Sequence, residues 1–545
     1  MQNFTEKELL EQIKNLQEEL QKIKKQKKYW IVWEEKEEKI DKNILPIVEE
    51  QKVLRIEETE NKPYNLIIEW DNFYALSVLQ NTHKNKIDVI YIDPPYNTGN
   101  KDFIYNDNYV DKEDSYRHSK WLSFMSKRLE LAKNLLKDDW VIFISIDDNE
   151  FAQLKLLCDE IFGERNFEWN LIWKTKTAAK WVPTINMLVT NHDYVLVYSK
   201  SKNFCFRWED RDLEKFWNSD NDPRWPWKAD NMKSTVSNNF FTITNPENWF
   251  SYTKNWAFSQ SSIENMIKEN KILWPKDENW TPRQKRFLSE MKNETTPLRT
   301  LIWEFQSETA TNKLKDLFLG EKKFDFPKHT EFMKLIINQA SNPNSTILDF
   351  FAWSWTTWHA VLELNKEDGW NRQFILCSNR ENTKENPEKN ICRDITYERN
   401  KRVIQGYTNA KWEQVEWLWW NLRYYKTEFI PKNKSIDDLR DSFINKCDDL
   451  LCIKENTFTK VNFWEEIPEL KIFKNKNNFT VILYDIFYLK KLITLLKLME
   501  DKKINLYIFS QSKNIYEEEL EDFTNITFAN IPNEILETYK KIFGL

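Results

Sequence analysis

The stretch Asp93-Pro94-Pro95-Tyr96 follows an apolar run, residues 89–92, that is typical of a buried strand. Open α/β sheets bind their ligands at the carboxyl ends of such strands. The two prolines have no N–H group, and we expect their carbonyl oxygens to point outward as acceptors. Asp93 and the Pro94 carbonyl could accept both hydrogens of an exocyclic amino group, while Tyr96 stacks on a flipped base. The tetrapeptide therefore predicts chemistry on a nucleobase amino group, although it also fits a plain turn.

A second stretch, "ILDFFAWSWTTWHAV" at residues 347–361, is predicted to form a strand, a turn and a helix that begins at Thr356 and Thr357. Nucleotide cofactors commonly lie at such a strand–turn–helix, because the backbone can approach the ligand there. A close approach of this kind favours glycine. The turn instead carries Trp353 and Trp355, with Trp358 in the helix, so the largest side chain stands where the geometry calls for none.

The composition offers an explanation for these tryptophans. The chain of 545 residues has only 6 glycines but 26 tryptophans. Ordinary glycine usage of about 7% would give roughly 38 glycines in a chain of this length. Trp70, Trp140 and Trp370 also occupy positions typical of glycine. We therefore interpret the excess as glycine encoded by UGA codons that were read as tryptophan; the alternative is a protein truly rich in tryptophan.

With glycine at positions 353, 355 and 358, the second stretch resembles the S-adenosylmethionine loop of the amino-methyltransferases, and not a P-loop, which would need Gly-Lys-Ser/Thr. This stretch and the tetrapeptide are both motifs of the β-class DNA adenine-N6 methyltransferases. Residues 29–430 therefore resemble that family, specifically the Mod subunit of a Type III restriction-modification system. In that family the tetrapeptide precedes the recognition region and the cofactor loop comes last, a circular reordering of the methyltransferase sheet. Aspartate at position 93 favours adenine over cytosine-N4 as the acceptor.

The resemblance implies roles for particular residues. The catalytic set would be Asp93, Pro94, Pro95 and Tyr96. S-adenosylmethionine would be bound by Asp71, Phe326, Pro327, Lys328, Asp349, Phe351, Ala352, Trp353, Ser354, Trp355, Thr356, Thr357 and Glu381. In many relatives the strand after the cofactor loop ends in an acid that binds the ribose; here Ser378 stands at that place, which leaves Glu381 as the candidate. The transfer itself needs no metal.

Basic residues gather in the stretch between the two motifs. Residues 171–207 carry six of them against a single acid, Asp193, and residues 281–287 add three more. Such charges hold DNA phosphates and fix register without reading sequence, although a solvated basic face is the alternative. The expected DNA contacts are Lys174, Lys176, Lys180, Lys200, Lys202, Arg207, Arg283, Lys285 and Arg286.

The order of elements predicts an α/β fold built on a Rossmann-like, circularly permuted methyltransferase sheet. Strands are expected at 64–70, 86–93, 140–148, 347–351 and 372–378, and helices at 114–136, 147–162 and 329–340. We divide the chain into an N-terminal amphipathic or coiled-coil helix (1–28), a catalytic half (29–165), an inserted target-recognition region (166–310), a cofactor-binding half (311–430) and a small C-terminal α/β domain (431–545).

Bulk properties indicate a soluble cytoplasmic protein. Charged residues make up 30% of the chain, no signal peptide opens it, and its six cysteines lack CxxC spacing. The net charge of −6 argues against indiscriminate DNA binding but not against a local basic cleft. The resemblance implies double-stranded DNA, a restriction (Res) subunit and a second copy of the chain as partners. The alternatives are a solitary adenine methyltransferase and a catalytically inactive DNA-specificity subunit.

Overall fold

The structure is a computed structural model, and the part of the chain that it describes contains several gaps. The described residues are 33–41, 43–59, 62–106, 108–176, 190–211, 213–217, 220–224, 226–277, 279–291, 295–324, 327–353, 356–382, 387–431, 446–461, 467–509, 517–521, 523–531 and 533–543. The helix predicted for residues 1–28 lies outside this set.

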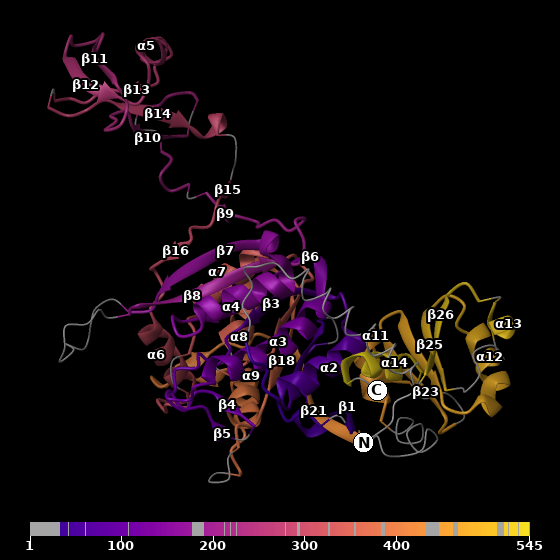
Figure 1. The fold of residues 1–545 in the computed structure, drawn as a ribbon. Helices are drawn as coiled ribbons and strands as arrows, with labels where there is room; N and C mark the ends of the chain where they lie inside the picture. The colour runs from indigo at the N-terminus through magenta and orange to yellow at the C-terminus, as the bar shows by residue number, and fades with distance from the viewer. Residues whose placement is uncertain are drawn as a thin grey trace, which may run out of the picture. The chain divides into compact units, whose positions relative to one another are not determined.

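A ten-stranded mixed sheet forms the centre of the main unit (Figure 1). Its strands, in spatial order, are β1 (Ile44–Glu50), β21 (Asn421–Pro431), β2 (Tyr64–Glu69), β18 (Gln373–Ser378), β17 (Thr346–Asp349), β3 (Ile87–Ile92), β6 (Leu136–Ile146), β8 (His192–Ser199), β7 (Phe167–Lys174) and β16 (Leu301–Ile302). The strands from β21 to β6 run parallel, and β8 is antiparallel to β6. The buried apolar runs of β3 and β18 fit strands that are covered on both faces.

The connections reverse direction between β17 and β3, which are neighbours in the sheet. From β17 the chain passes through α8 (Thr356–Asp368) to β18 on one side, and from β3 through α3 (Arg117–Leu135) to β6 on the other. Right-handed crossovers therefore place α8 and α3 on opposite faces. A point of reversal of this kind opens a crevice at the carboxyl ends of the two strands.

The chain reaches β3 before β17, although the two strands lie side by side. This order confirms the circularly permuted, Rossmann-like sheet that the sequence predicted. The predicted helices at 114–136, 147–162 and 329–340 correspond to α3, α4 (Phe151–Cys158) and α7 (Thr330–Gln339). The remaining helices of this part are α2 (Asn72–Thr82), α6 (Ser307–Leu317) and α9 (Glu398–Gln405).

Residues 166–310 divide between two structures. Strands β7 and β8 belong to the main sheet, whereas Trp208–Leu298 forms a compact unit of its own. That unit holds the sheet β10-β14-β13 (Trp227–Asn231, Arg283–Phe287, Ile272–Leu273), the hairpin β11-β12 (Asn239–Thr244, Ser251–Trp256), the helix α5 (Gln260–Lys268) and the short pair β9-β15 (Glu209–Asp210, Thr295–Thr296). Its small core includes Met232, Tyr252, Trp256 and Ile263. The boundaries 166–310 remain a prediction.

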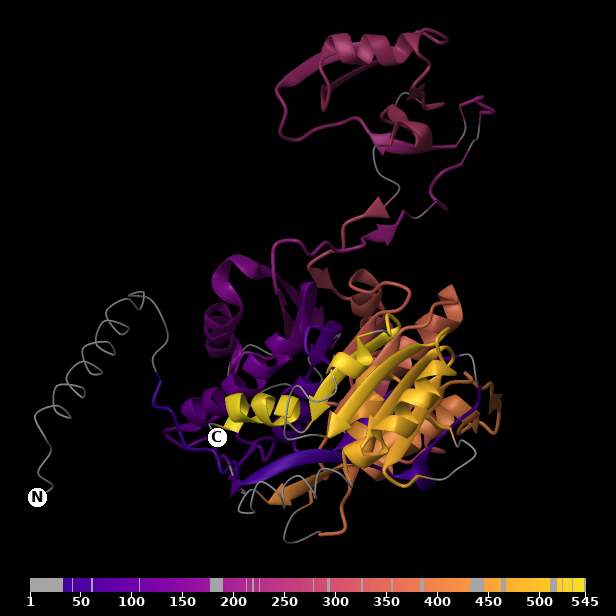
Figure 2. The same cartoon turned by 90° about the vertical axis from the view of Figure 1, so that its right-hand side faces the viewer.

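The C-terminal residues form a five-stranded sheet beside the main one (Figure 2). It contains β22 (Thr459–Lys460), β23 (Leu470–Asn475), β24 (Asn478–Leu483), β25 (Lys503–Phe509) and β26 (Ile526–Ile531), with helices α11 (Asp448–Glu455), α12 (Leu489–Lys497), α13 (Glu517–Leu520) and α14 (Asn533–Phe543). The Tyr539 hydroxyl donates to the Pro46 carbonyl, and Glu50 N donates to Asp449 Oδ2 at 2.8 Å. The two sheets thus share one core. None of the described helices has the length and apolar character that a membrane crossing requires.

Candidate active site

The tetrapeptide leaves the end of β3 as a turn that α3 supports. Trp121 of α3, fully buried, donates its indole Nε1–H to the Pro95 carbonyl at 2.7 Å. Asp93 and Tyr96 are partly exposed, whereas Pro94 and Pro95 are buried. The turn is therefore fixed from beneath by a tryptophan whose polar group is satisfied, and its acid and ring reach the surface of the crevice.

Lys328, which lies just before α7, contacts the side chains of the catalytic turn. Its Nζ donates to Tyr96 Oη at 2.5 Å and lies 3.2 Å from Asp93 Oδ1 and 3.4 Å from Asp193 Oδ2. Burial opposes the charge of this amine, but Asp93 and Asp193 outweigh it and raise the pKa of Lys328. Burial raises the pKa of Asp93, and Lys328 partly offsets that effect. The contact makes Lys328 the counter-ion of Asp93.

Asp193 is a residue of the site that sequence reasoning missed. It entered the sequence analysis only as the single acid in a basic stretch, whereas the structure places it on β8, facing Lys328. Strand β8 pairs with β6, which in turn pairs with β3, and this pairing brings Asp193 close to the turn that follows β3.

A buried carboxylate holds the residue that follows the tetrapeptide. Asn97 has a φ of 57° and donates its Nδ2 to Glu150 Oε1 at 2.5 Å. His118 Nδ1 lies 2.7 Å from the same oxygen, and Arg117 Nε donates to His118 Nε2 at 3.2 Å, so a neutral ring protonated at Nδ1 satisfies both contacts. Burial raises the pKa of Glu150, against the opposing effects of Asn97 and His118. The sequence analysis did not identify Glu150, because nothing local indicates that it contacts residues 97 and 118.

The cofactor stretch begins at the end of β17. Asp349 Oδ1 accepts from Phe351 N at 3.0 Å, and Oδ2 accepts from Thr357 Oγ1 at 2.9 Å. Burial raises the pKa of Asp349 to about 7, with a smaller contribution from the charge of Asp93. Thr356 Oγ1 donates to the Lys328 carbonyl at 2.8 Å. The two motifs, distant in sequence, therefore converge on one crevice.

Two tryptophans of this stretch, Trp353 and Trp358, are among the described residues, and one of them leaves a buried polar group without a partner. Trp358 is fully buried, yet its Nε1–H has no hydrogen-bond partner among the described residues. A buried donor left unpaired costs about 1–3 kcal/mol. Trp353 is partly buried against the core, and its backbone N–H donates a hydrogen bond to the Phe351 carbonyl at 2.8 Å. The predicted cofactor residues Phe326, Ser354 and Trp355 lie outside the described residues.

The other predicted cofactor residues lie near the same edge. Asp71 caps α2 by accepting from Phe73 N at 2.8 Å and pairs with Arg128 at 3.2 Å, while Asn72 Nδ2 donates to the Phe350 carbonyl at 3.1 Å. Glu381 follows β18 with a φ of 50° and pairs with Lys389 at 3.1 Å. Pro327, Phe351 and Ala352 are buried.

The backbone at other tryptophans has the conformation that favours glycine. Trp208, Trp249, Trp412 and Trp419 have φ values of 63°, 62°, 63° and 52°. A bulky residue in this left-handed region is an outlier, whereas glycine enters it freely. Trp249 and Trp412 also expose 79% and 83% of their surface. Trp121 differs from these four residues, because it is fully buried and its indole N–H donates to the Pro95 carbonyl.

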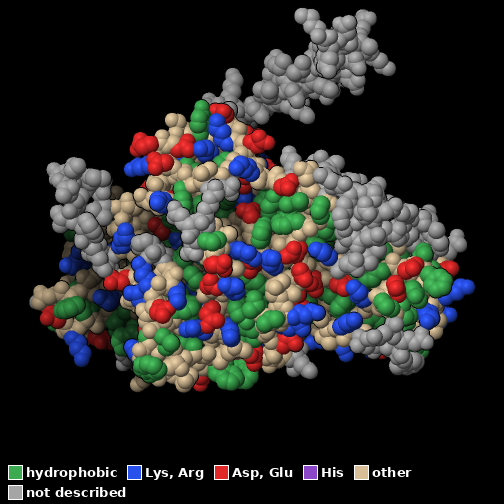
Figure 3. All heavy atoms as spheres, turned by 90° about the horizontal axis from the view of Figure 1, so that it is seen from below, with side chains coloured by type: hydrophobic (Ala, Val, Ile, Leu, Met, Phe, Trp, Pro, Cys, Tyr) green, Lys and Arg blue, Asp and Glu red, His purple; other side chains and the backbone are tan. Residues whose placement is uncertain are grey.

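The nine basic residues expected to contact DNA do not share one environment. Lys285 is buried and paired with Asp220, and Lys200 Nζ donates to the Leu136 carbonyl at 2.6 Å. Arg207 lies 4.4 Å from the Trp370 ring. The exposed members are Lys176, Lys202, Arg207, Arg283 and Arg286; Lys174 is half-buried, and Lys180 lies outside the described residues. On the face drawn in Figure 3, acidic and basic side chains are interspersed.

The chain is similar in sequence to known DNA methyltransferases. Residues 87–408 match the N6/N4 methyltransferase family model, described as DNA methylase. The Mod subunit of the Type III restriction-modification enzyme StyLTI from Salmonella typhimurium is 36% identical over 372 residues, covering 62% of this chain and 56% of the relative. The Mod subunit of EcoPI from Escherichia phage P1 is 32% identical over 444 residues, covering 68% and 66%.

A relative of another type is similar over most of its length. The Type II methyltransferase M.KpnI from Klebsiella pneumoniae is 33% identical over 387 residues, which cover 66% of this chain and 89% of that protein. The chain thus spans just over half of StyLTI Mod and most of M.KpnI.

Proposed function

Because this chain belongs to the DNA methylase family, we propose that it transfers a methyl group from S-adenosylmethionine to N6 of a flipped adenine in double-stranded DNA. The observation that carries the proposal is the convergence of Asp93 and Asp349 at the ends of the neighbouring strands β3 and β17. Aspartate at position 93 and the Mod names of two relatives favour adenine over cytosine-N4 as the acceptor.

The catalytic turn would act by orientation. Asp93 and the Pro94 carbonyl accept the two hydrogens of the amine, and the Tyr96 ring stacks on the base. Lys328 opposes the effect of burial on the pKa of Asp93 and donates a hydrogen bond to the Tyr96 hydroxyl. When bound, S-adenosylmethionine would supply the methyl group on its sulfonium and leave as a neutral thioether, and the proton released from N6 would pass to Asp93 or to solvent. Holding amine and methyl in line supplies much of the acceleration, because it removes the entropy cost of their encounter.

The residues around β17 fit this cofactor in part. Acids follow β17, β18 and β2 at one edge, namely Asp349, Glu381 and Asp71, where a ribose and an adenine amino group would meet acceptors. Phe351, Ala352, Thr356 and Thr357 would line the turn, and Pro327 would line the methionine end together with Phe326. Indoles at 353 and 355 would obstruct the approach, so the glycine form of the chain is the active one.

Labelled S-adenosylmethionine tests the activity. The chain with glycine at 353, 355 and 358 is expected to label double-stranded DNA, with the label recovered as N6-methyladenine. Recovery as N4-methylcytosine would overturn the base assignment, and no labelling by the glycine form would overturn the proposed reaction. Modification sequencing of the native genome would identify the site and show whether one strand or both are methylated.

Peptide masses from the native organism test the coding hypothesis independently of activity. Glycine is expected at positions 208, 249, 412 and 419, where the backbone φ is positive. Tryptophan is expected at 121, where the indole hydrogen-bonds to Pro95. Tryptophan at the four positive-φ positions would contradict the hypothesis.

We further propose that the chain is the modification subunit of a Type III system, acting as a homodimer with a Res subunit in the cytoplasm. The names of the StyLTI and EcoPI relatives support this assignment. The similarity to M.KpnI favours a second candidate, a methyltransferase that acts without a restriction subunit. Co-purification of a helicase-like ATPase from the native organism would favour the first, and its absence together with full methylation activity would favour the second.

DNA recognition is assigned to residues 166–310. In the Trp208–Leu298 unit, Arg283 and Arg286 of β14 are exposed, although Arg286 pairs with Asp230 at 3.2 Å, and both are candidates for phosphate contacts. Lys285 points into the core of that unit and serves its stability. Phosphate contacts of this kind set affinity and salt dependence, and they leave sequence choice to other residues.

A further inference from the structure

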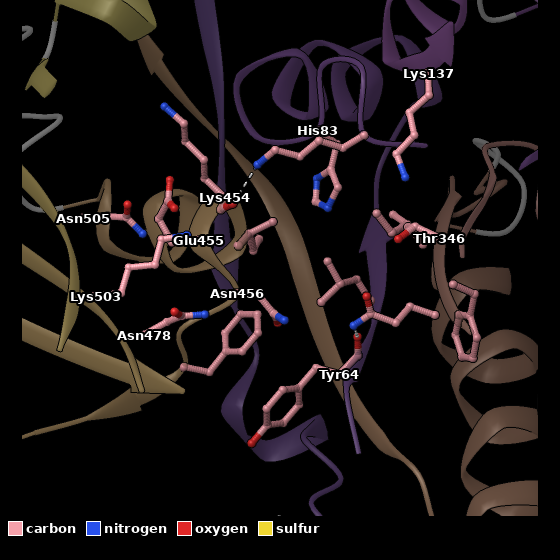
Figure 4. A pocket seen from close by; sticks show the side chains of 17 residues that line it. Tyr64, His83, Lys137, Thr346, Lys454, Glu455, Asn456, Asn478, Lys503 and Asn505 are labelled. Carbon is pink, nitrogen blue, oxygen red and sulfur yellow. Dashed lines mark hydrogen bonds between the residues drawn. The ribbon is translucent and has the colours of Figure 1, made fainter. Parts of the chain in front are cut away.

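A pocket of about 430 Å³ lies between the main sheet and the C-terminal sheet (Figure 4). Its walls include residues that begin strands: Tyr64 begins β2, Thr346 begins β17, Asn478 begins β24 and Lys503 begins β25. Asp93 and Asp349, in contrast, stand at the carboxyl ends of parallel strands. The pocket therefore lies at the edge of the main sheet opposite to the catalytic crevice and is a separate site.

The charge of the pocket favours an anion. Four lysines line it, Lys86, Lys137, Lys454 and Lys503, against the single carboxylate of Glu455. Asp88 neutralises Lys137 at 2.5 Å, and Glu455 accepts from the Tyr507 hydroxyl at 2.6 Å. Among the residues that line the pocket, lysines outnumber acids. Clustered lysines in a concave site bind phosphate as point charges.

The opposite end of the pocket is aromatic. Tyr64 and Phe458 meet edge to face with centroids 4.8 Å apart. In Figure 4, Tyr64 lies at one end of the pocket, Lys137 and Lys454 lie at the other, and the Asn456 side chain is between them. Asn478 and Asn505 add further amides to the lining. The volume is within the range of about 300–1,000 Å³ that small-ligand sites occupy.

We propose that this pocket binds a nucleotide, with its phosphates toward Lys454 and Lys503 and its base toward Tyr64 and Phe458. The lining combines lysines, amides and aromatic rings, the groups that bind the three parts of a nucleoside polyphosphate. A bound nucleotide would bridge the two sheets, since its ligands come from both. This site goes beyond methyl transfer and does not depend on it.

Calorimetric titration of the full chain with ADP, adenosine and pyrophosphate tests the proposal. ADP is expected to bind saturably and more tightly than either fragment. Lys503→Ala and Lys454→Ala should each weaken ADP binding roughly tenfold, the usual cost of losing one charged hydrogen bond. Lys490→Ala, which removes an exposed lysine of α12 outside the pocket, should bind ADP as the unmodified chain does.

Two further arms separate this site from the other binding surfaces. Asp349→Asn, in the cofactor crevice, should leave the ADP affinity unchanged, whereas loss of ADP binding in this variant would overturn the proposal. The proposal is also overturned by the absence of saturable ADP binding, by ADP binding that both lysine variants retain in full, or by pyrophosphate binding as tightly as ADP. Weaker binding of a short DNA duplex by Lys503→Ala, without any ADP binding, would assign these lysines to DNA instead.

Discussion

The catalytic turn and the cofactor turn leave neighbouring strands at the same edge of the sheet, yet the buried tryptophans beside them differ in how well they are accommodated. Beside the catalytic turn, the buried Trp121 donates its indole N–H to the Pro95 carbonyl, and Lys328 donates to the Tyr96 hydroxyl. Asn97 donates its Nδ2 to Glu150, although its buried Oδ1 has no partner among the described residues. Beside the cofactor turn, Asp349 at the end of β17 is well bonded, but the buried indole N–H of Trp358 in α8 has no partner among the described residues.

This difference indicates which tryptophans belong in the fold. Trp121 supports the catalytic turn, because its buried indole N–H donates to the Pro95 carbonyl. A native buried side chain is expected to have its polar group hydrogen-bonded in this way. Trp358 satisfies the packing but not the hydrogen bonding of its site, and Trp353 occupies a turn that a ligand must approach. The coding hypothesis accounts for both observations.

Restoring glycine at 353, 355 and 358 should give the largest change. The chain with tryptophan at these positions is expected to bind no S-adenosylmethionine and to transfer no methyl group. The glycine form should do both, because the backbone can then approach the cofactor. Titration calorimetry with S-adenosylmethionine and a labelling assay measure the two effects. Methyl transfer by the tryptophan form would remove the contrast between the two turns.

Asp93→Asn in the glycine form should lower kcat by about 10²–10³-fold, because it removes the charged acceptor that orients the amine. Affinity for S-adenosylmethionine should change little, since Asp93 stands on the catalytic side of the crevice. Asp193→Asn is the matched control. It removes the other carboxylate beside Lys328 but leaves Asp93 in place, so its kcat should fall much less. Equal losses in the two variants would mean that Lys328, and not Asp93, dominates the site.

Glu150→Ala should lower kcat by roughly tenfold, because it removes a charged hydrogen bond that positions Asn97 behind the tetrapeptide. Glu150→Gln should restore most of the activity, since an amide oxygen can still accept from Asn97 and His118. The dissociation constant for S-adenosylmethionine should stay the same in both variants. An unchanged kcat in Glu150→Ala would show that the turn holds its geometry without this carboxylate.

Patterns that are local in sequence predicted much of the fold and part of the site. The tetrapeptide, the cofactor stretch and the strands at 86–93 and 372–378 are continuous segments, and their hydrophobic runs determine their type. Asp193 and Glu150 were missed because their contacts with Lys328 and Asn97 arise from strand pairing across the sheet. The sequence predicts a DNA contact at Lys285 from its charge alone. It does not show that Lys285 is buried beside Asp220.

The smallest expected effect concerns Asp349 and stability. Burial raises its pKa from 3.8 to about 7, so the folded chain keeps a proton that the unfolded chain releases. Stability is therefore expected to fall as pH rises from about 4 to about 7, because the folded state binds more protons across that window. Asp349→Asn removes this dependence and should raise Tm above pH 7 by a few degrees, with little difference near pH 4, as measured by thermal denaturation.

Thr357→Val provides the control for this pH dependence. The Thr357 hydroxyl donates to Asp349 and lowers its pKa, so its loss should move the fall in stability to higher pH. The Asn variant should not respond in this way when the two substitutions are combined, because it has no proton to release. If stability falls over the same pH range in the tryptophan and glycine forms, Asp349 is buried by β17 and α8 alone. A fall at lower pH in the glycine form would mean that the indoles add to the burial of Asp349. The tryptophans of the cofactor stretch would then perturb Asp349 as well as their own surroundings.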